Sequence, residues 1–373
     1  MILVNNPGTW AHLYWPLGHA PWHGWTPTDL VFPFFLFVVG VSMALSFASR
    51  LDRGATRASL AWRVLRRSAI IFAIGMFLHG FPQFRLATIR IPGVLQRIAV
   101  CYLMAGLVVL ALPRRGRGLS PQSSGTQRVA RLAPILSVIS VLLVGYWALM
   151  TFVPVPGYGA GRLDVEGNLA AYVDRWLMLG HLWKPTWDPE GVLSTFPAIT
   201  TVLIGVLVGE WLRTKRDAPN KVAGLLAVGA AGLILGKLLD PFFPINKNLW
   251  TSTYVIFTGG FAMVLLGLIY WFVDIKGWRR WGMPFLVFGT NAITVFALSS
   301  LVAKASSVFK TTVAGPDGIG PPRLVSWHTY IYQELFAPLA SPKNGSLLFA
   351  LSYVLLWLAL MSFLYRRRIF IKI

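Results

Sequence analysis

The sequence predicts an all-α fold, a polytopic transmembrane helical bundle of about ten spans with the first one truncated. Hydrophobic residues make up 55% of the 373-residue chain and charged residues only 13%, whereas about a quarter of the residues in a soluble domain are charged. The mean hydropathy of +0.62 is equally far from that of a soluble protein. Apolar windows of about twenty residues, the length needed to cross a bilayer, recur along the whole chain.

Nine such windows are predicted to span the membrane, and residues 1–4 resemble the end of a further span that is too short to cross by itself. This fragment is counted as the truncated first span. The nine full windows lie near residues 29–48, 68–83, 93–112, 132–153, 192–212, 222–240, 251–273, 283–303 and 346–365.

The formal net charge of the chain is +21, and the positions of the basic residues indicate the orientation of the chain in the membrane. Of the 34 Lys and Arg residues, 22 lie in short segments that alternate with the remaining loops, as expected for the cytoplasmic side of a membrane protein. Because the basic residues lie in these segments, their charge does not indicate a protein that binds nucleic acid. The segments predicted to be cytoplasmic are 50–67, 113–131, 213–221, 276–280 and 366–372.

The intervening loops are predicted to be extracytoplasmic, and loops this long seldom serve only as connectors. Residues 154–190 carry five of the 13 acidic residues of the chain. The sequence is expected to form one integral-membrane domain over residues 1–373, with a flexible Gly/Ser/Arg-rich linker near 113–131. The predicted extracytoplasmic loops are 5–27, 84–92, 154–190, 241–250 and 304–345.

His19 and Asn5 are the candidate catalytic residues. His19 begins a run of imidazoles, tryptophans and one carboxylate that leads into the span at 29–48. An imidazole titrates near neutral pH and is a suitable general base for an amine or hydroxyl nucleophile. The Asn5 amide could stabilise an oxyanion, but Asn5 also opens an Asn-Asn-Pro-Gly turn, which spacing alone favours.

Three further residues have alternative roles that the sequence leaves open. Asp29 could cap the helix that follows or contact substrate. Arg97, one turn into its helix, could extend outward to the interface or point into the bundle and hold an anion. Trp22 could anchor the chain at the membrane interface or stack on a sugar ring.

Simple local contacts explain several other polar residues. Ion pairs are expected between Glu210 and Arg213 and between Lys237 and Asp240, each three residues apart on a helix. The single cysteine excludes a disulfide or a cysteine metal site. No metal site is expected, because prolines and glycines around His19 and His23 oppose the helix that would bring these side chains together.

Six stretches of the sequence resemble the transmembrane acyltransferase family typified by heparan-α-glucosaminide N-acetyltransferase. This resemblance implies a helical bundle that transfers an acetyl group from cytoplasmic acetyl-CoA to an amino sugar of the glucosamine type on the far side of the membrane. It also implies that His19 is the active-site histidine and Asn5 its partner. The stretches are MILVNNPG (1–8), GHAPWHGWTPTDLVFPFFLFVVGVSM (18–43), IRIPGVLQRIAVCYL (89–103), DPEGVLSTFPAI (188–199), PINKNLWTSTYVIFTGG (244–260) and FGTNAI (288–293).

The resemblance also sets expectations for binding and location. Asp29, Trp22 and Arg97 are expected to bind the sugar. Arg63, Arg66 and Arg67 suit the phosphates of acetyl-CoA, although they serve membrane topology equally well. The luminal domain of the lysosomal enzyme is missing from this sequence. A bacterial inner-membrane protein with its catalytic loop toward the periplasm is therefore expected, and bundles of this type often pair as homodimers. The alternative function is an inner-membrane carrier for N-acetylglucosamine or a related sugar.

Overall fold

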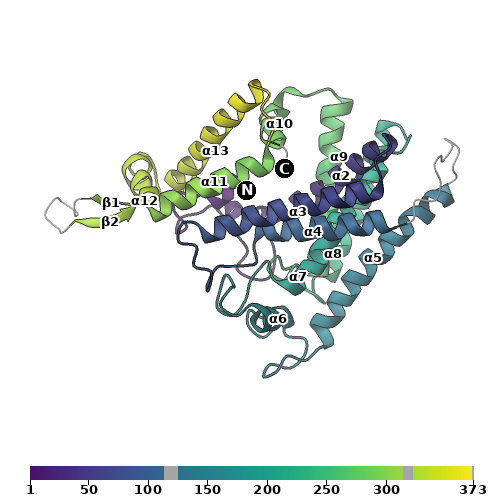
Figure 1. Ribbon diagram of the computed structural model, residues 1–373, viewed down its shortest axis with the longest axis horizontal. Helices are drawn as coiled ribbons and strands as arrows, with labels where there is room; N and C mark the ends of the chain where they lie inside the picture. The colour runs from purple at the N-terminus through teal and green to yellow at the C-terminus, as the bar shows by residue number, and fades with distance from the viewer. Residues whose placement is uncertain (113–124, 314–321, 372–373) are drawn as a thin grey trace. The chain divides into compact units, whose positions relative to one another are not determined.

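The computed structural model describes residues 1–112, 125–313 and 322–371, and the side chains from residue 132 onward in the second range. The chain divides into two compact units. The terminal unit contains Met1–His19, Thr26–Thr28 and Arg279–Ile373, and the central unit contains Ala20–Trp25 and Asp29–Trp278. The prediction of one domain over the whole chain stays a prediction. Figure 1 shows that helices make up nearly all of both units.

The all-α, polytopic fold is confirmed, with fewer spans than predicted. Among the described residues, seven helices are long and apolar enough to cross a membrane, or eight if one bent pair is a single span. The predicted first span is only the four-residue helix α1 (Ile2–Asn5). The window at 68–83 lies in α3 (Arg57–Gly80), whose first half carries four arginines. The window at 283–303 is bent by 73° where α10 meets α11.

The central unit consists of α2 to α9 and a terminal π-helical turn. Side chains of Thr56, Asn168 and Thr251 cap three of these helices by accepting a hydrogen bond from a backbone N–H of the first turn. Residues 113–124 of the predicted linker lie outside the described residues, whereas residues 125–131 already belong to α5. The remaining helices are α2 (Val31–Asp52), α4 (Val94–Ala111), α5 (Gly125–Phe152), α6 (Leu169–Met178), α7 (Val192–Leu212), α8 (Ala218–Leu239) and α9 (Ser252–Tyr270), followed by the turn Trp271–Ile275.

Glycines bring the backbones of neighbouring helices into direct contact within this unit. A Cβ atom at Gly40 of α2 would collide with the carbonyl oxygen of Val202 in α7, and one at Gly205 of α7 would collide with the carbonyl oxygen of Phe37. In the α8–α9 pair, a Cβ at Gly229 would lie 2.8 Å from the carbonyl oxygen of Gly260. Small residues at helix crossings are typical of membrane bundles, where packing rather than the hydrophobic effect holds helices together.

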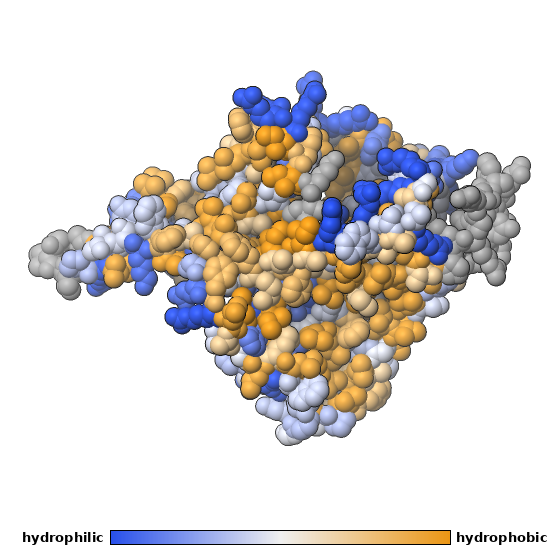
Figure 2. Space-filling model, viewed as in Figure 1, coloured by the Kyte–Doolittle hydropathy of each residue, from blue (hydrophilic) through white to orange (hydrophobic). Residues whose placement is uncertain are grey.

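The surface of the central unit is apolar around its helices and basic at one end. Figure 2 shows mostly hydrophobic residues over α3 and α4, with hydrophilic residues concentrated where α2 leads into α3. Large apolar side chains are exposed, including Trp62 of α3, Val141 of α5 and Val228 of α8. This surface is that of an integral membrane protein.

The loops predicted to share the extracytoplasmic side meet at the other end of the central unit. The backbone N–H of Ile91 donates to the carbonyl of His181 over 3.0 Å, and that of Gly24 donates to Ile245 over 2.7 Å. The indole N–H of Trp22 donates to the carbonyl of Leu163 over 2.8 Å. Four of the five loops thus contribute residues to one polar end.

The terminal unit contains both chain ends and one small hairpin. Strands β1 (Lys310–Val313) and β2 (Arg323–Ser326) pair antiparallel, with Lys310 opposite Ser326. The side chain of Asn291, at the bend between α10 and α11, donates to the carbonyl of Ile369 and accepts from the N–H of Ile371. The helices are α1, α10 (Met283–Thr290), α11 (Ala292–Val308), α12 (Trp327–Ile331) and α13 (Pro342–Arg366), with short turns at Trp15–Leu17, Pro27–Leu30, Arg280–Gly282, Tyr332–Phe336 and Ala337–Leu339.

Candidate functional site

The loop that carries His19 is held by two buried threonines. The Thr26 hydroxyl donates to the carbonyl oxygen of Gly18 over 2.6 Å, and the Thr28 hydroxyl donates to that of Pro16 over 2.9 Å. Both threonines are 3% exposed, whereas His19 is exposed. The backbone immediately before His19 is therefore fixed while its imidazole faces outward.

Asn5 ends α1 in the same unit as His19. Its side chain is exposed, and its backbone N–H donates to the carbonyl of Met1 over 3.0 Å. The neighbouring Asn6 side chain is the one that stabilises the turn, because it is buried and donates to the carbonyl of Ile2 over 2.8 Å. The turn thus does not occupy the Asn5 amide.

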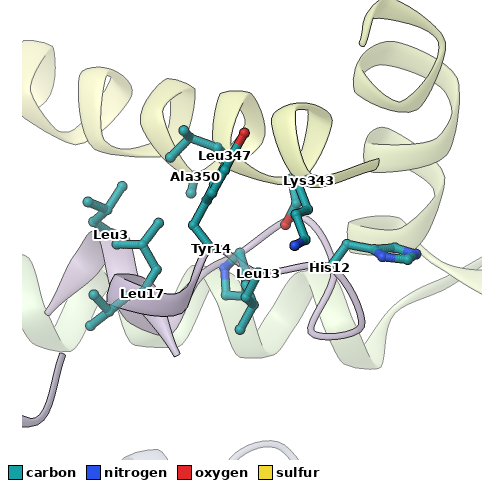
Figure 3. A pocket seen from close by; sticks show the side chains of 11 residues that line it. Leu3, His12, Leu13, Tyr14, Leu17, Lys343, Leu347 and Ala350 are labelled. Carbon is teal, nitrogen blue, oxygen red and sulfur yellow. The ribbon is translucent and has the colours of Figure 1, made fainter. Parts of the chain in front are cut away.

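A small pocket of about 10 Å³ lies beside this loop, between α1, residues 7–17 and α13. Figure 3 shows the side chains of Leu3 and Leu17 on the side of α13 that carries Leu347 and Ala350. The lining is predominantly apolar, and the pocket is far smaller than a ligand-binding cavity. The polar side chains that line it are His12, Tyr14, Lys343 and Ser346.

Asp29 belongs to the central unit and is 1% exposed. One carboxylate oxygen accepts from the N–H of Ala20 over 3.0 Å, and the other lies 3.4 Å from the Lys247 ammonium nitrogen. The Tyr254 hydroxyl donates to the backbone carbonyl of Asp29 over 2.5 Å. Capping of the helix by Thr28 or Asp29 stays a prediction, and the hydrogen bonds of these two side chains given above join them to Pro16 and Ala20 of the preceding loop. The α2 N-cap is Leu30 and has no side-chain hydrogen bond.

Lys247 is the partly buried cation that pairs with Asp29, and the sequence analysis did not identify it. Burial lowers the pKa of the Lys247 ammonium, and the carboxylates of Asp29 and Glu190 partly restore it. The recognisable signal was a lysine in a loop predicted to be extracytoplasmic, where cations are infrequent.

Arg97 points into the bundle, which decides between its two predicted orientations. The residue is 2% exposed, and its guanidinium carbon lies 5.2 Å from the ring centre of Trp250. Nη2 donates to the carbonyl of Gly191 over 3.1 Å and to the Ser194 hydroxyl over 2.5 Å. Nε and Nη1 are buried without a hydrogen-bond partner.

Asp174 of α6 is a second buried acid that the sequence analysis did not single out. Its carboxylate accepts from the N–H of Val192, at the start of α7, over 2.8 Å. Burial raises the pKa of Asp174 to about 7, and the negative charge of Asp188 adds to this effect. The hydrogen bond from Val192 and the charges of Arg97 and Arg175 oppose it.

Arg90 connects two of the polar loops. Its guanidinium lies 2.7 Å from Asp188 and 2.6 Å from Glu190. Burial by itself would lower the pKa of Arg90, but the hydrogen bonds and charges of these two acids outweigh it and raise the pKa. Asp188 also accepts from the N–H of Trp183 over 2.8 Å, so this ion pair organises the loop rather than waiting for a ligand.

Trp22 lies in an edge-to-face cluster of indoles. Its ring centre is 5.0 Å from that of Trp187, which is 5.2 Å from that of Trp183. Trp22 is half-buried against the loop core, whereas Trp183 is 49% exposed. Exposed indole faces in this cluster could stack on a sugar ring or lie at the membrane interface.

Arg63, Arg66 and Arg67 are exposed along the first half of α3. Arg67 lies over the ring of Tyr102, 5.2 Å from its centre. The polar loops follow the other end of α3, so roughly 20 Å of helix separates Arg67 from them. The structure therefore brings Asp29, Arg97 and Trp22 to one end of the central unit and places the three arginines toward the other.

Two curated proteins match this sequence over most of its length. Heparan-α-glucosaminide N-acetyltransferase of Homo sapiens is 33% identical over 341 residues, which are 79% of this chain and 50% of the human enzyme. The Mus musculus enzyme of the same name is 32% identical over 337 residues, again 79% of this chain and 50% of the relative.

This chain is related to both enzymes. The resemblance predicted from its motifs is thereby confirmed, and the chain spans about half the length of the curated relatives it matches. No protein-family model matches it.

Proposed function

We propose that this chain is a membrane N-acetyltransferase that moves an acetyl group from cytoplasmic acetyl-CoA to a glucosamine-type amino sugar on the extracytoplasmic side. The observation that carries this proposal is the relationship to two enzymes named heparan-α-glucosaminide N-acetyltransferase over 79% of the chain. The polar end of the central unit supports it, because burying this many charged side chains is costly in a membrane protein without a functional reason. A bacterial inner membrane, with this end toward the periplasm, is the proposed location.

In the proposed reaction, His19 acts as the general base. The amine nitrogen attacks the thioester carbonyl, a C–N bond forms, the C–S bond breaks, and the amine proton passes through the His19 imidazole to the departing thiolate of CoA. The exposed Asn5 amide would donate a hydrogen bond to the oxyanion. Direct transfer is favoured over an acetyl-histidine intermediate, because holding both substrates together supplies a large part of the rate enhancement without a covalent step.

The other candidate residues would bind the substrates. Trp22 would contact the face of the sugar ring. Asp29 and Arg97 would help to bind the sugar at the polar end of the central unit. Arg63, Arg66 and Arg67 would bind phosphates of acetyl-CoA at the basic end, since guanidinium groups pair well with phosphate. Acetyl-CoA is thus a co-substrate, and no metal is required.

The test measures transfer of labelled acetyl from acetyl-CoA to glucosamine by the purified protein. His19→Ala is expected to abolish turnover, whereas His12→Ala, which removes another exposed imidazole of the same loop, should retain it. Equal loss in both variants would contradict the role of His19. If the folded protein transfers no acetyl but imports N-acetylglucosamine into proteoliposomes without acetyl-CoA, the chain is the alternative carrier.

A further inference from the structure

Arg97 is a buried cation whose hydrogen bonds are incomplete. Two partly buried cations at this end of the central unit each have a carboxylate within 4 Å, Arg90 through Asp188 and Glu190, and Lys247 through Asp29. In the part of the chain that the structure describes, Arg97 has no salt bridge, and Nε and Nη1 have no acceptor. Three of its five N–H bonds are therefore available.

The surroundings of Arg97 favour a negatively charged ligand. The N-terminal end of α7, a 21-residue helix, lies against the guanidinium through Gly191 and Ser194, and helix N-termini attract anions. Trp250 covers the guanidinium carbon at 5.2 Å and excludes water from that side. An unpaired charge in such a site costs several kcal/mol, a cost that a bound anion would offset.

The acidic residues at the polar end of the central unit do not supply the hydrogen-bond acceptors that Arg97 lacks. Asp188 is held by Arg90 and by the N–H of Trp183. Asp174 accepts from the N–H of Val192, and burial raises the pKa of this carboxyl, which favours its neutral form. The positive charge of Arg97 is thus only partly balanced by the protein itself.

We propose that Arg97 is the centre of an oxyanion-binding site at the first turn of α7, which takes a carboxylate, sulfate or phosphate group of a substrate. The ligand would accept hydrogen bonds from Nε and Nη1, and the Nη2 contacts to Gly191 and Ser194 hold the guanidinium in place. The identity of the substrate rests on the proposed function, which supplies two sources of such a group. One is an acidic substituent on the acceptor sugar, which the position of Arg97 at the polar end favours, and the other is a phosphate of CoA, which would have to reach this end instead of the three arginines of α3.

Calorimetric titration of the purified protein tests the site without requiring acetyl transfer. Sulfate and phosphate are titrated at constant ionic strength, with chloride as the reference anion. Arg97→Gln should weaken oxyanion affinity at least about tenfold, because charge-assisted hydrogen bonds are lost. Arg162→Gln removes an exposed, paired cation from the same group of loops and should change the affinity less than about twofold. His19→Ala should leave the affinity unchanged even though it abolishes turnover.

Titration with CoA and with glucuronate then separates the two sources, and the one whose affinity falls in Arg97→Gln is the ligand class. Equal affinity of wild type and Arg97→Gln for every anion would overturn the site and leave ordered water as the partner of Arg97. If Arg97→Gln does not fold, the midpoint of thermal unfolding of the wild type provides the test, since a bound anion raises it with concentration. No rise with sulfate beyond that with chloride would also overturn the proposal.

Discussion

Two buried threonines, Thr26 and Thr28, use their hydroxyl groups to hold the backbone of residues 16–18. The short distance from Thr26 to the carbonyl of Gly18, 2.6 Å, places this restraint next to the residue proposed as the base. The threonines are therefore positioning residues for His19.

Replacing Thr26 with Val should destabilise the protein by about 1–2 kcal/mol, because the carbonyl of Gly18 loses its donor in a buried place. The kcat of acetyl transfer should fall by a larger factor than the KM rises, because the substitution loosens the position of His19 and leaves the substrate contacts in place. Thr26→Ser keeps the hydroxyl and should restore kcat. Thermal unfolding and steady-state kinetics of the two variants provide the comparison, and an unchanged kcat in Thr26→Val would contradict the positioning role.

Asp174 should make stability depend on pH in the direction opposite to an ordinary surface acid. Burial raises its folded-state pKa to about 7, above the unfolded value of 3.8, so the folded state binds more protons between these values. The free energy of unfolding should therefore fall as the pH rises from about 4 to 7, by at most about 1.4 kcal/mol per pH unit. Charges facing Asp174 come from Asp188, Arg97 and Arg175.

Asp174→Asn should remove this slope, while Asp164→Asn, which alters an exposed acid paired with Arg162, should preserve it. The midpoint of thermal unfolding, measured from pH 4 to 8, gives the answer. A wild-type protein that becomes more stable across this range, with Asp174→Asn unchanged, would show that the carboxyl is not neutral in the folded state.

For individual residues, the sequence indicated which side chains belong to the polar end better than it indicated which side chains they contact. It identified Asp29, Arg97 and Trp22 as polar or aromatic side chains at helix entrances, and all three lie at the polar end of the central unit. The ion pairs Glu210–Arg213 and Lys237–Asp240 are confirmed at 2.9 and 3.0 Å, because their spacing on one helix fixes the contact. The Asp29–Lys247 pair joins residues 218 positions apart, and no local pattern encodes such a contact.

Among helices, the α2–α7 pair depends on glycine. Gly40→Ala should destabilise the protein by about 1–3 kcal/mol, because the methyl group would meet the carbonyl of Val202 and the helices would have to separate. Gly145→Ala is the matched control, since a Cβ there meets nothing within 4 Å. Alanine favours helix over glycine by about 1 kcal/mol, so this variant should be as stable as wild type or more stable. Thermal unfolding in detergent distinguishes the two, and equal midpoints would contradict the close contact.

The bend between α10 and α11 shows how one predicted span differs from a straight helix. Hydropathy treats residues 283–303 as a continuous helix, because the window is apolar throughout. Asn291 interrupts it by bonding to the backbone of Ile369 and Ile371, a contact from the far end of the chain that hydropathy does not detect. The element was predictable from composition, and its break was not.

Asn291→Leu should release the C-terminal residues from this bend, because both hydrogen bonds to their backbone are lost. Limited proteolysis should then cut the segment after Arg368 faster than in the wild type, while Asn220→Leu, an exposed change outside this contact, should not affect that rate. An unchanged rate in Asn291→Leu would show that other contacts hold the tail.

For the whole molecule, orientation in the membrane is the main prediction. In the central unit, α2 and α7 begin at the polar end and lead into basic segments at their C-terminal ends, which agrees with the alternation predicted from charge. Cys101 is the single cysteine and is buried, so a Cys101→Ala background allows single-cysteine labelling. In intact cells a membrane-impermeant maleimide should label Arg162→Cys, whereas Lys215→Cys should react only after permeabilisation. The reverse pattern would invert the proposed sidedness and with it the side of acetyl acceptance.

Composition and charge were sufficient to predict the class of the fold, because a bilayer demands long apolar helices and satisfied backbone groups. They overestimated the number of spans, since α3 combines membrane-spanning length with an arginine-rich first half. The charge pattern predicted that the polar loops lie on the same side of the membrane. It did not predict which residues of these loops contact one another, because those contacts depend on how the helices cross.

The direct backbone contact between α2 and α7 has a consequence for variation among related proteins. Asp29 precedes α2 and the Arg97 partners Gly191 and Ser194 begin α7, so this crossing sets the spacing between two parts of the polar end. A contact between main chains has no side chain whose size could be adjusted in small steps. We therefore expect relatives with different ligand preferences to differ in the loops of the polar end. The distance between α2 and α7 at their crossing should stay the same in these relatives.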